Sequence, residues 1–150
     1  MKLNDAIKSK FANDKHLASV NLLFSAYWLK DHLIAALKPH GITLEQHNVM
    51  RILKGSHPNE MRVKDIASRM VEKSSNVPRI LDKLVIKKLA KRTISPADKR
   101  ETLVALTESG ITLIETARAS VDELTEQVMT ISDKEARALS NILDKMRAAE

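Results

Sequence analysis

Asn76, Arg79 and Lys83 recur at intervals of three and four residues in the middle of the sequence. On a helix this spacing places the three side chains on one face, opposite apolar residues such as Leu81 and Leu84. Arginine is a natural bidentate donor to guanine, and asparagine pairs in the same way with adenine. The stripe therefore predicts contacts to base edges in the major groove of DNA.

The residues before this stripe suit the phosphate backbone of a duplex. Ser74 and Ser75 come at the expected helix start, where free backbone N–H groups and hydroxyls can bind phosphate oxygens. Lys64 and Lys73 add positive charge to the same part of the chain. We expect all four residues to contact DNA.

A basic hairpin is predicted after the stripe. Two β-prone stretches, residues 89–94 and 102–106, flank the turn-forming sequence 95–100. Lys99 and Arg100 lie near the tip of this hairpin, or wing. We expect them to reach a neighbouring phosphate or a narrow minor groove.

The stripe belongs to the second helix of a predicted helix-turn-helix. Apolar residues at helical spacing predict a short helix ending near Met70, and residues 73–76 form a turn and N-cap cluster. Pro78 must lie in the first turn of the second helix, which continues to about Lys87. In a helix-turn-helix, this second helix is the one that enters the major groove.

Longer helices are predicted on both sides of this motif. A helix over residues 15–38 ends before Gly41, and residues 43–46 form a capping box that begins the next helix. After the wing come a helix over residues 107–130 and a last helix that begins at Ser132 with a second capping box. The apolar stripes of the flanking helices exceed what one small winged helix can cover, so a dimer is expected.

The charge distribution agrees with a polyanionic partner. The chain has 150 residues, enough for a single domain, and a net charge of +6. Residues 61–100 hold 12 basic and 4 acidic residues, a net charge of +8, whereas residues 101–150 hold 5 basic and 10 acidic residues, a net charge of −5. A folded basic surface is the electrostatic footprint of duplex binding. Residues 1–14 are weakly patterned and predict a mobile or partner-packed leader.

Several classes of site are excluded by composition. There is no cysteine, and the three glycines are too far apart to form a phosphate-binding loop. No apolar run is long enough to span a membrane and no signal peptide is recognisable, so the expected location is the cytoplasm. Neither a metal site nor a cofactor is expected, because the histidines lack ligand spacing. These histidines are His16, His32, His40, His47 and His57.

Residues 43–110 resemble the winged helix-turn-helix of the MarR (multiple antibiotic resistance regulator) family of bacterial transcription factors. The order and length of the helices agree over nearly the whole chain. The most specific match is the Asp-x-Arg of the wing followed by Leu-Thr-x-x-Gly. The matching segments are Thr43-Leu44-x-Gln46, Ser74-Ser75-Asn76-Val77-x-Arg79, Leu81-Asp82-Lys83-Leu84, Asp98-Lys99-Arg100 and Leu106-Thr107-Glu108-Ser109-Gly110.

The resemblance implies a mainly α fold with a small β-hairpin wing, in a single domain over residues 1–150. Residues 43–110 would be the winged helix-turn-helix, flanked by dimerisation helices in residues 1–38 and 111–150. It implies a homodimer that binds a pseudo-palindromic operator, usually as a repressor, and is released by a small aromatic or anionic ligand. By position, Ser75, Asn76 and Arg79 would contact DNA, while Asp98 would brace Arg100 as Arg100 enters the minor groove.

Two further expectations concern individual residues. Trp28 and His32 on the long first helix could meet His47 and Arg51 of the next helix beside a cleft, which suggests a ligand pocket. Lys88 stands where the family usually has glycine at the end of the recognition helix. Either Lys88 adopts a left-handed backbone conformation or the end of this helix is reshaped.

Three other functions compete with a sequence-specific regulator. A non-specific architectural DNA-binding protein would need the basic face but no half-site spacing. A protein-binding winged helix would use the same face against an acidic partner. A small enzyme is disfavoured, because no nucleophile and base fall at a recognisable spacing.

Overall fold

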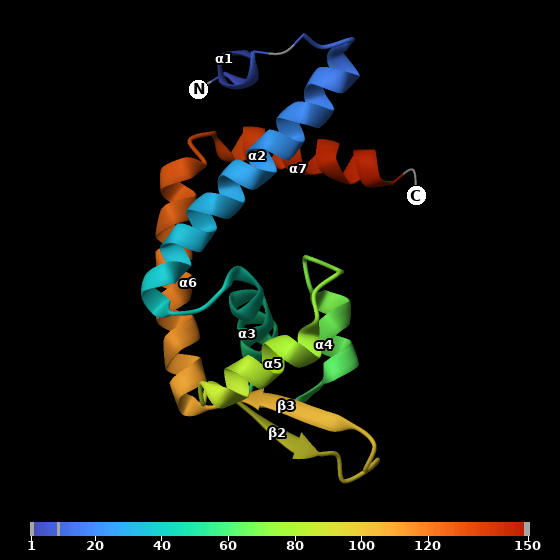
Figure 1. The fold of residues 1–150 in the computed structure, drawn as a ribbon, viewed down its shortest axis with the longest axis vertical. Coiled ribbons are helices and arrows are strands. Elements are labelled where there is room, and N and C mark those ends of the chain that lie inside the picture. The colour runs from blue at the N-terminus through green and yellow to red at the C-terminus, as the bar shows by residue number, and fades with distance from the viewer. Residues whose placement is uncertain (1, 9, 149–150) are drawn as a thin grey trace.

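The computed structural model, which describes residues 2–8 and 10–148, shows a mainly helical protein with one small sheet (Figure 1). This architecture confirms the predicted fold class. The elements are α1 (Leu3–Ile7), α2 (Asp14–Leu37), a 3-10 turn (Lys38–His40), α3 (Leu44–Ser56), β1 (Met61–Arg62), α4 (Val63–Arg69), α5 (Val77–Ile86), β2 (Ala90–Ile94), β3 (Thr102–Leu106), α6 (Glu108–Val128) and α7 (Asp133–Arg147).

The turn into α3 is built as its sequence predicts. Gly41 ends the preceding 3-10 turn with φ = 66°, a left-handed conformation that glycine adopts without steric cost. The Thr43 hydroxyl then accepts a hydrogen bond from the Gln46 N–H, and the Gln46 side chain accepts one from the Thr43 N–H, both at 3.2 Å. This capping box satisfies two donors that a helix start otherwise leaves free.

The hydrophobic core lies where α3, α4, α5 and the sheet meet. Helix α5 buries one face and leaves the other in solvent, as its sequence pattern predicts. Burying a large aliphatic side chain contributes about 1.5–3 kcal/mol, so this core holds the helix-turn-helix together. The fully buried side chains include Val49, Met50, Ile66, Met70, Val77, Leu81, Leu84 and Val104.

The sheet has three antiparallel strands in the order β1-β3-β2. Strands β2 and β3 form the predicted hairpin, with Ala90 opposite Leu106 and Ile94 opposite Thr102. The two-residue strand β1 pairs with β3 through Met61 and Arg62 and was not predicted. It connects the base of the wing to the start of α4.

The end of α5 shows which conformation Lys88 adopts. This residue has φ = 58°, so the helix ends in a left-handed residue although no glycine is present. The Lys88 N–H donates to the Val85 carbonyl and the Leu89 N–H to the Leu84 carbonyl, each at 2.9 Å. These two bonds form a Schellman motif, which holds a non-glycine residue in a conformation that it disfavours.

Lys88→Gly is therefore expected to stabilise the protein by about 0.5–1 kcal/mol. Glycine relieves the cost of the left-handed conformation, and this gain exceeds the extra entropy of its unfolded chain. Urea unfolding followed by circular dichroism measures the change. An unchanged or lower free energy of unfolding would show that Lys88 bears no backbone strain.

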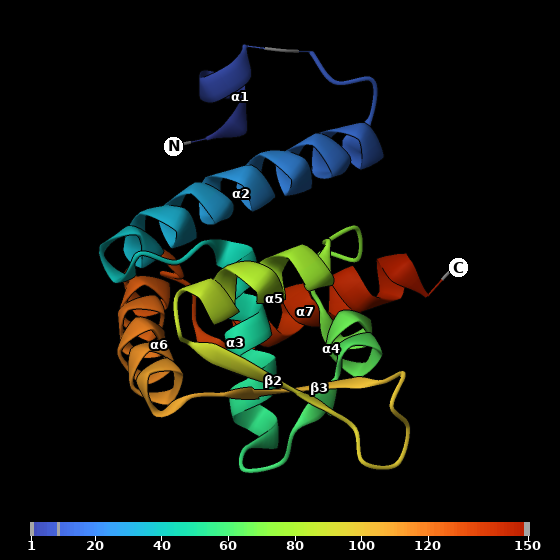
Figure 2. The ribbon, with the colours of Figure 1, turned by 60° about the horizontal axis from the view of Figure 1, so that its bottom comes forward.

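The long helices leave much of their apolar surface uncovered. Helix α2 extends away from the core and contacts α6 and α3, as two views show (Figures 1 and 2). Among its apolar residues, Leu23 is 56% exposed and Tyr27 62%, while Leu37 is buried. Helix α7 buries no residue and exposes Ile142 and Met146. The chain alone therefore leaves a large part of the apolar surface of α2 and α7 in contact with solvent.

Two further observations concern the ends of the chain and its hydropathy. The leader predicted over residues 1–14 contains the short helix α1 over residues 3–7, in which Leu3 is buried. Residues 1, 9 and 149–150 lie outside the described residues.

Among the helices that the structure describes, none has the length and apolar character required to cross a membrane.

Candidate nucleic-acid interface

Helix α5 exposes the predicted stripe to solvent. The side chains of Asn76, Arg79 and Lys83 are exposed, and Val77 and Leu84 on the opposite side are buried. Asn76 is also the N-cap, since its side-chain oxygen accepts a hydrogen bond of 3.1 Å from the Arg79 N–H. A bidentate contact from Asn76 to adenine would have to share this oxygen with the cap, whereas the Arg79 guanidinium has no partner among the described residues.

A hollow of about 280 Å³, lined mostly by polar residues, lies between the starts of α3 and α5. Hydrogen bonds at the start of α3, from the backbone N–H of Glu45 and from Thr43, lower the pKa of the Glu45 carboxyl. Glu45 therefore stays ionised at neutral pH, near the ammonium group of Lys83. The residues that line the hollow are Thr43, Glu45, Gln46, Glu72, Ser75, Asn76, Arg79, Ile80 and Lys83.

The turn between α4 and α5 differs in detail from the expected phosphate site. The Ser75 N–H, expected to be free, donates to the Glu72 carbonyl at 3.2 Å. The Ser75 hydroxyl is buried without a hydrogen-bond partner among the described residues. The Ser74 hydroxyl contacts the Glu72 carboxylate at 3.3 Å, and the Lys73 ammonium donates to the Ser68 carbonyl at 2.7 Å. Of these groups, the exposed Ser74 and Lys73 remain available to a phosphate after a side-chain rearrangement.

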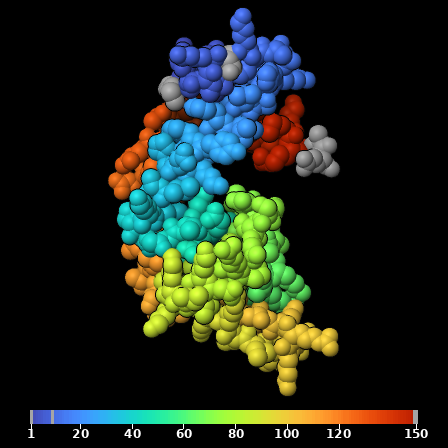
Figure 3. Space-filling view, in the orientation of Figure 1, coloured from blue at the N-terminus to red at the C-terminus, as the bar shows by residue number. Residues whose placement is uncertain are grey.

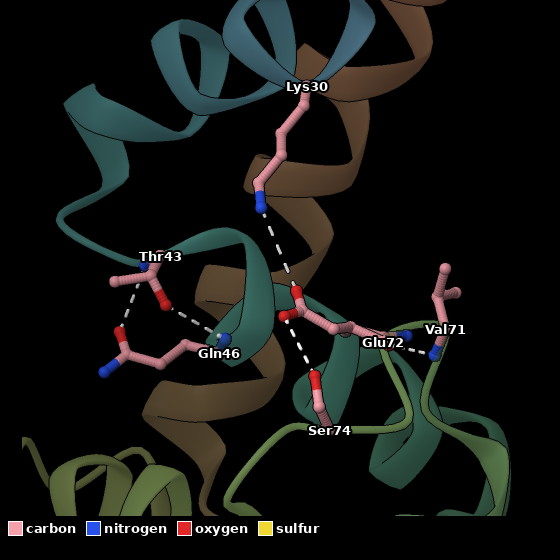
Figure 4. Close-up of polar contacts among 7 residues, drawn as sticks. Lys30, Thr43, Gln46, Val71, Glu72 and Ser74 are labelled. Carbon is pink, nitrogen blue, oxygen red and sulfur yellow. Dashed lines mark hydrogen bonds and ion pairs between the residues drawn. The ribbon is translucent and has the colours of Figure 1, made fainter. Parts of the chain in front are cut away.

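Contacts from α2 and α3 hold this turn in place. Figure 4 shows Lys30 reaching from α2 towards Glu72, with the ammonium 3.9 Å from the carboxylate. The side chain of Asn48 on α3 accepts a hydrogen bond of 3.0 Å from the Val71 N–H. In the space-filling view, the outline of the molecule is indented between the end of α7 and this turn (Figure 3).

Arg92 joins the wing to the recognition helix. From β2, its guanidinium lies 2.5 Å from the Asp82 carboxylate and donates to the Pro78 carbonyl at 3.0 Å. Both acceptors lie on α5, so the strand and the helix are held in a fixed relation. No sequence pattern marks Arg92, because its partners are 10 and 14 residues away and no helical spacing relates them.

The wing tip carries the predicted basic side chains, and both Lys99 and Arg100 are exposed. Asp98 accepts a hydrogen bond of 2.9 Å from the Arg100 backbone N–H, so the brace implied by the family acts on the main chain rather than on the guanidinium. Lys64, expected to contact DNA, forms an ion pair of 3.3 Å with Glu101. The exposed stripe of α5 and the basic residues of the wing tip thus form two groups, and Arg92 links the elements that carry them.

The four residues expected to line a ligand pocket form two separate pairs. The rings of Trp28 and His32 lie 4.6 Å apart on α2, and the His32 ring nitrogen is 2.8 Å from the Trp28 carbonyl. His47 is buried on α3, whereas Arg51 one turn later is exposed. None of the four lines the hollow near α5 or a second hollow between the end of α2 and the start of α3.

His47 has an unusual environment for a histidine. Its Nε2 atom is buried without a hydrogen-bond partner among the described residues. Burial lowers the pKa of His47, and the positive charge of Arg51 lowers it further, against an opposing effect of Asp122. His47 is therefore neutral at neutral pH, and a negatively charged ligand would not find an imidazolium there.

Comparison with known proteins gives three kinds of match. The sequence model of the MarR family matches residues 42–102, which include the helix-turn-helix and most of the wing. The HTH-type transcriptional regulator MhqR of Bacillus subtilis (strain 168) is 26% identical over 135 residues, covering 89% of this chain and 92% of MhqR. The crystal structure of the S. aureus MepR–DNA complex is 26% identical with a TM-score of 0.79, covering 88% of this chain and 97% of that one.

A further solved structure supports the fold alone. AbsC, a MarR family transcriptional regulator from Streptomyces coelicolor, superimposes with a TM-score of 0.81 over 94% of this chain and 97% of its own, at 17% identity. The likeness therefore extends beyond residues 42–102 to the long helices on both sides. The matched region contains the α5 stripe and the wing tip.

Proposed function

We propose that this chain is a MarR-family transcription regulator, and that it acts as a homodimer that binds a specific DNA sequence. The members of this family are regulators rather than enzymes. That the chain is a DNA-binding transcription regulator follows from the family. The dimer, the specific operator and the response to a ligand are proposals.

The observation that carries the proposal is the exposed polar face of α5. Asn76, Arg79 and Lys83 project from a helix whose other face is fixed in the core, and two exposed basic residues, Lys99 and Arg100, lie on the adjacent wing. A rigid helix with such a face can enter the major groove while the wing reaches the flanking minor groove. The matched S. aureus MepR structure is a complex with DNA, and this chain has the same fold at 26% identity.

The uncovered apolar surface supports a homodimer. Leu23 and Tyr27 of α2 and Ile142 and Met146 of α7 are more than half exposed. Such side chains on long terminal helices are typical of a surface that a second copy covers. Two copies related by a two-fold axis would present two α5 helices to successive major grooves, and hence would require a pseudo-palindromic site.

We further propose that DNA binding represses transcription and that a small aromatic or anionic ligand reverses it. The tilted ring pair of Trp28 and His32 supports an aromatic ligand near α2, because Trp28 remains 38% exposed beside His32. Ligand binding near Trp28 would change its fluorescence. An unchanged spectrum across a panel of aromatic acids would contradict this part of the proposal.

Selection of duplexes from a random pool tests the central proposal. We expect the wild-type protein to enrich a two-fold symmetric sequence, and footprinting to protect two half-sites about one helical turn, roughly 34–36 Å, apart. Binding should weaken steeply with salt, since phosphate neutralisation supplies much of the affinity. Continuous protection without sequence enrichment would favour the architectural alternative, and binding to no duplex would contradict both.

A further inference from the structure

Glu101 lies at the base of the wing, next to the exposed Arg100, and contacts two cations at the start of α4. Its Oε2 atom is 3.0 Å from the Arg62 Nε, and its Oε1 atom is 3.3 Å from the Lys64 Nζ. The side chain of Glu101 is only 23% exposed, whereas every other acidic partner in an ion pair between described residues is at least 53% exposed. The carboxylate of Glu101 is thus more enclosed than the carboxylates of the other ion pairs, while Arg62 and Lys64 themselves remain exposed.

The main chain of Glu101 closes the wing loop. Its N–H donates to the Asp98 carbonyl at 2.9 Å, and its carbonyl accepts from the Ser95 N–H at 3.0 Å. Ser95 is itself buried, and its hydroxyl faces the Asp98 N–H at 3.4 Å. The residue that closes the loop is therefore the one whose side chain is held by the start of α4.

A carboxylate at this position opposes DNA binding on charge alone. It lies one residue from Arg100 and neutralises Lys64, both of which could otherwise meet phosphates. Repulsion between this carboxylate and a phosphate backbone costs affinity unless the side chain has a compensating role. The compensating role that the contacts support is mechanical, because the ion pairs fix the base of a loop whose tip residues, Lys99 and Arg100, are exposed.

We propose that Glu101 is a positioning residue of the wing, which aims Arg100 at the minor groove by anchoring the loop to Arg62 and Lys64. This inference rests on the proposed DNA-binding function. Without the anchor, the loop must become ordered when DNA binds. The entropic cost of this ordering makes binding weaker. Glu101 acts through Arg100 and does not itself contact DNA.

Glu101→Gln tests the proposal, because positioning of the wing and simple charge neutralisation predict opposite changes in DNA affinity. The change keeps the size of the side chain and raises the net charge by one. We expect it to weaken binding to the duplex selected by the wild-type protein by about five- to tenfold at fixed salt. If Glu101 merely neutralised Arg62 and Lys64, the variant would instead bind more tightly, with a steeper dependence on salt.

Asp65→Asn is the matched control for charge. Asp65 lies in the first turn of α4, beside Lys64, and its carboxylate forms no ion pair with a described residue. The substitution makes the same charge change close to the same place. We expect it to leave the affinity unchanged or slightly increased, so that weakening by Glu101→Gln cannot be attributed to charge.

A double-mutant cycle with Arg100→Ala separates positioning from a general loss of structure. If Glu101 acts by aiming Arg100, then Glu101→Gln should change the affinity by less than about twofold when Arg100 is already absent. This inference alone would be overturned if Glu101→Gln had its full effect in the Arg100→Ala protein. It would also be overturned if the Glu101→Gln protein bound DNA as tightly as the wild type. Failure of the wild-type protein to bind any selected duplex would overturn the proposed function and this inference with it.

Discussion

Gly110→Ala should destabilise the protein by about 3 kcal/mol, as a severe case of overpacking. A Cβ atom at this position would lie 2.0 Å from the Leu89 carbonyl oxygen and 3.0 Å from its carbon. Both atoms belong to the backbone, so no side-chain rotation relieves the clash. The start of α6 would have to move away from the corner between α5 and β2, where Thr107 bonds to the Leu89 and Lys88 carbonyls.

Gly55→Ala is the matched control, since Gly55 also lies within a helix but a Cβ there meets nothing within 4 Å. Alanine should stabilise α3 by about 0.5–1 kcal/mol, because it restricts the unfolded chain and favours the helix. Urea unfolding followed by circular dichroism measures both variants. A Gly110→Ala protein as stable as the wild type would show that α6 does not need its close approach to Leu89.

Arg79→Ala should weaken binding to the selected duplex by about 1–3 kcal/mol, or roughly five- to hundredfold, and relax the preference at one base position. Arg79 is exposed near the start of α5, and its guanidinium is not engaged by another described residue. It is therefore free to donate two hydrogen bonds to a guanine. Competition binding with a set of single-base variants of the duplex gives the change at each position.

Arg79→Lys provides the control that separates base reading from charge. Lysine keeps the positive charge but lacks the planar pair of donors. The lysine variant should therefore retain most of the salt dependence of the wild type and lose preference at the same base position as the alanine variant. If Arg79→Ala weakened binding to every duplex by the same factor, Arg79 would contact phosphate rather than a base.

The parts of the fold that sequence analysis predicted are those fixed by local chemistry. The capping boxes at Thr43 and Ser132 are each contained within four residues, and both are present in the structure. Pro78 could lie only near the start of a helix, and it occupies the first turn of α5. The exposed stripe followed from helical spacing once α5 had a defined start and a buried face.

The parts that were missed depend on contacts between distant segments. Strand β1 has two residues and exists because Met61 and Arg62 pair with β3, far later in the chain, which no local pattern indicates. Arg92 and Glu101 look like ordinary surface charges in the sequence, and their partners are assigned only by the packing of the sheet against α4 and α5. The four-residue ligand pocket stays a prediction, since its residues come from two helices whose relative placement no local pattern fixes.

The link that Arg92 makes between β2 and α5 has a mechanical consequence. Because Arg92 joins β2 to Asp82 and Pro78 of α5, we expect the helix and the hairpin to rotate together as one unit. The hairpin tip projects farther from the hydrophobic core than α5 does (Figure 1), so a small rotation moves the tip through a longer arc than the helix. If the wing and α5 contact DNA as proposed, any reorientation of the pair would therefore break the contact of the wing before that of α5.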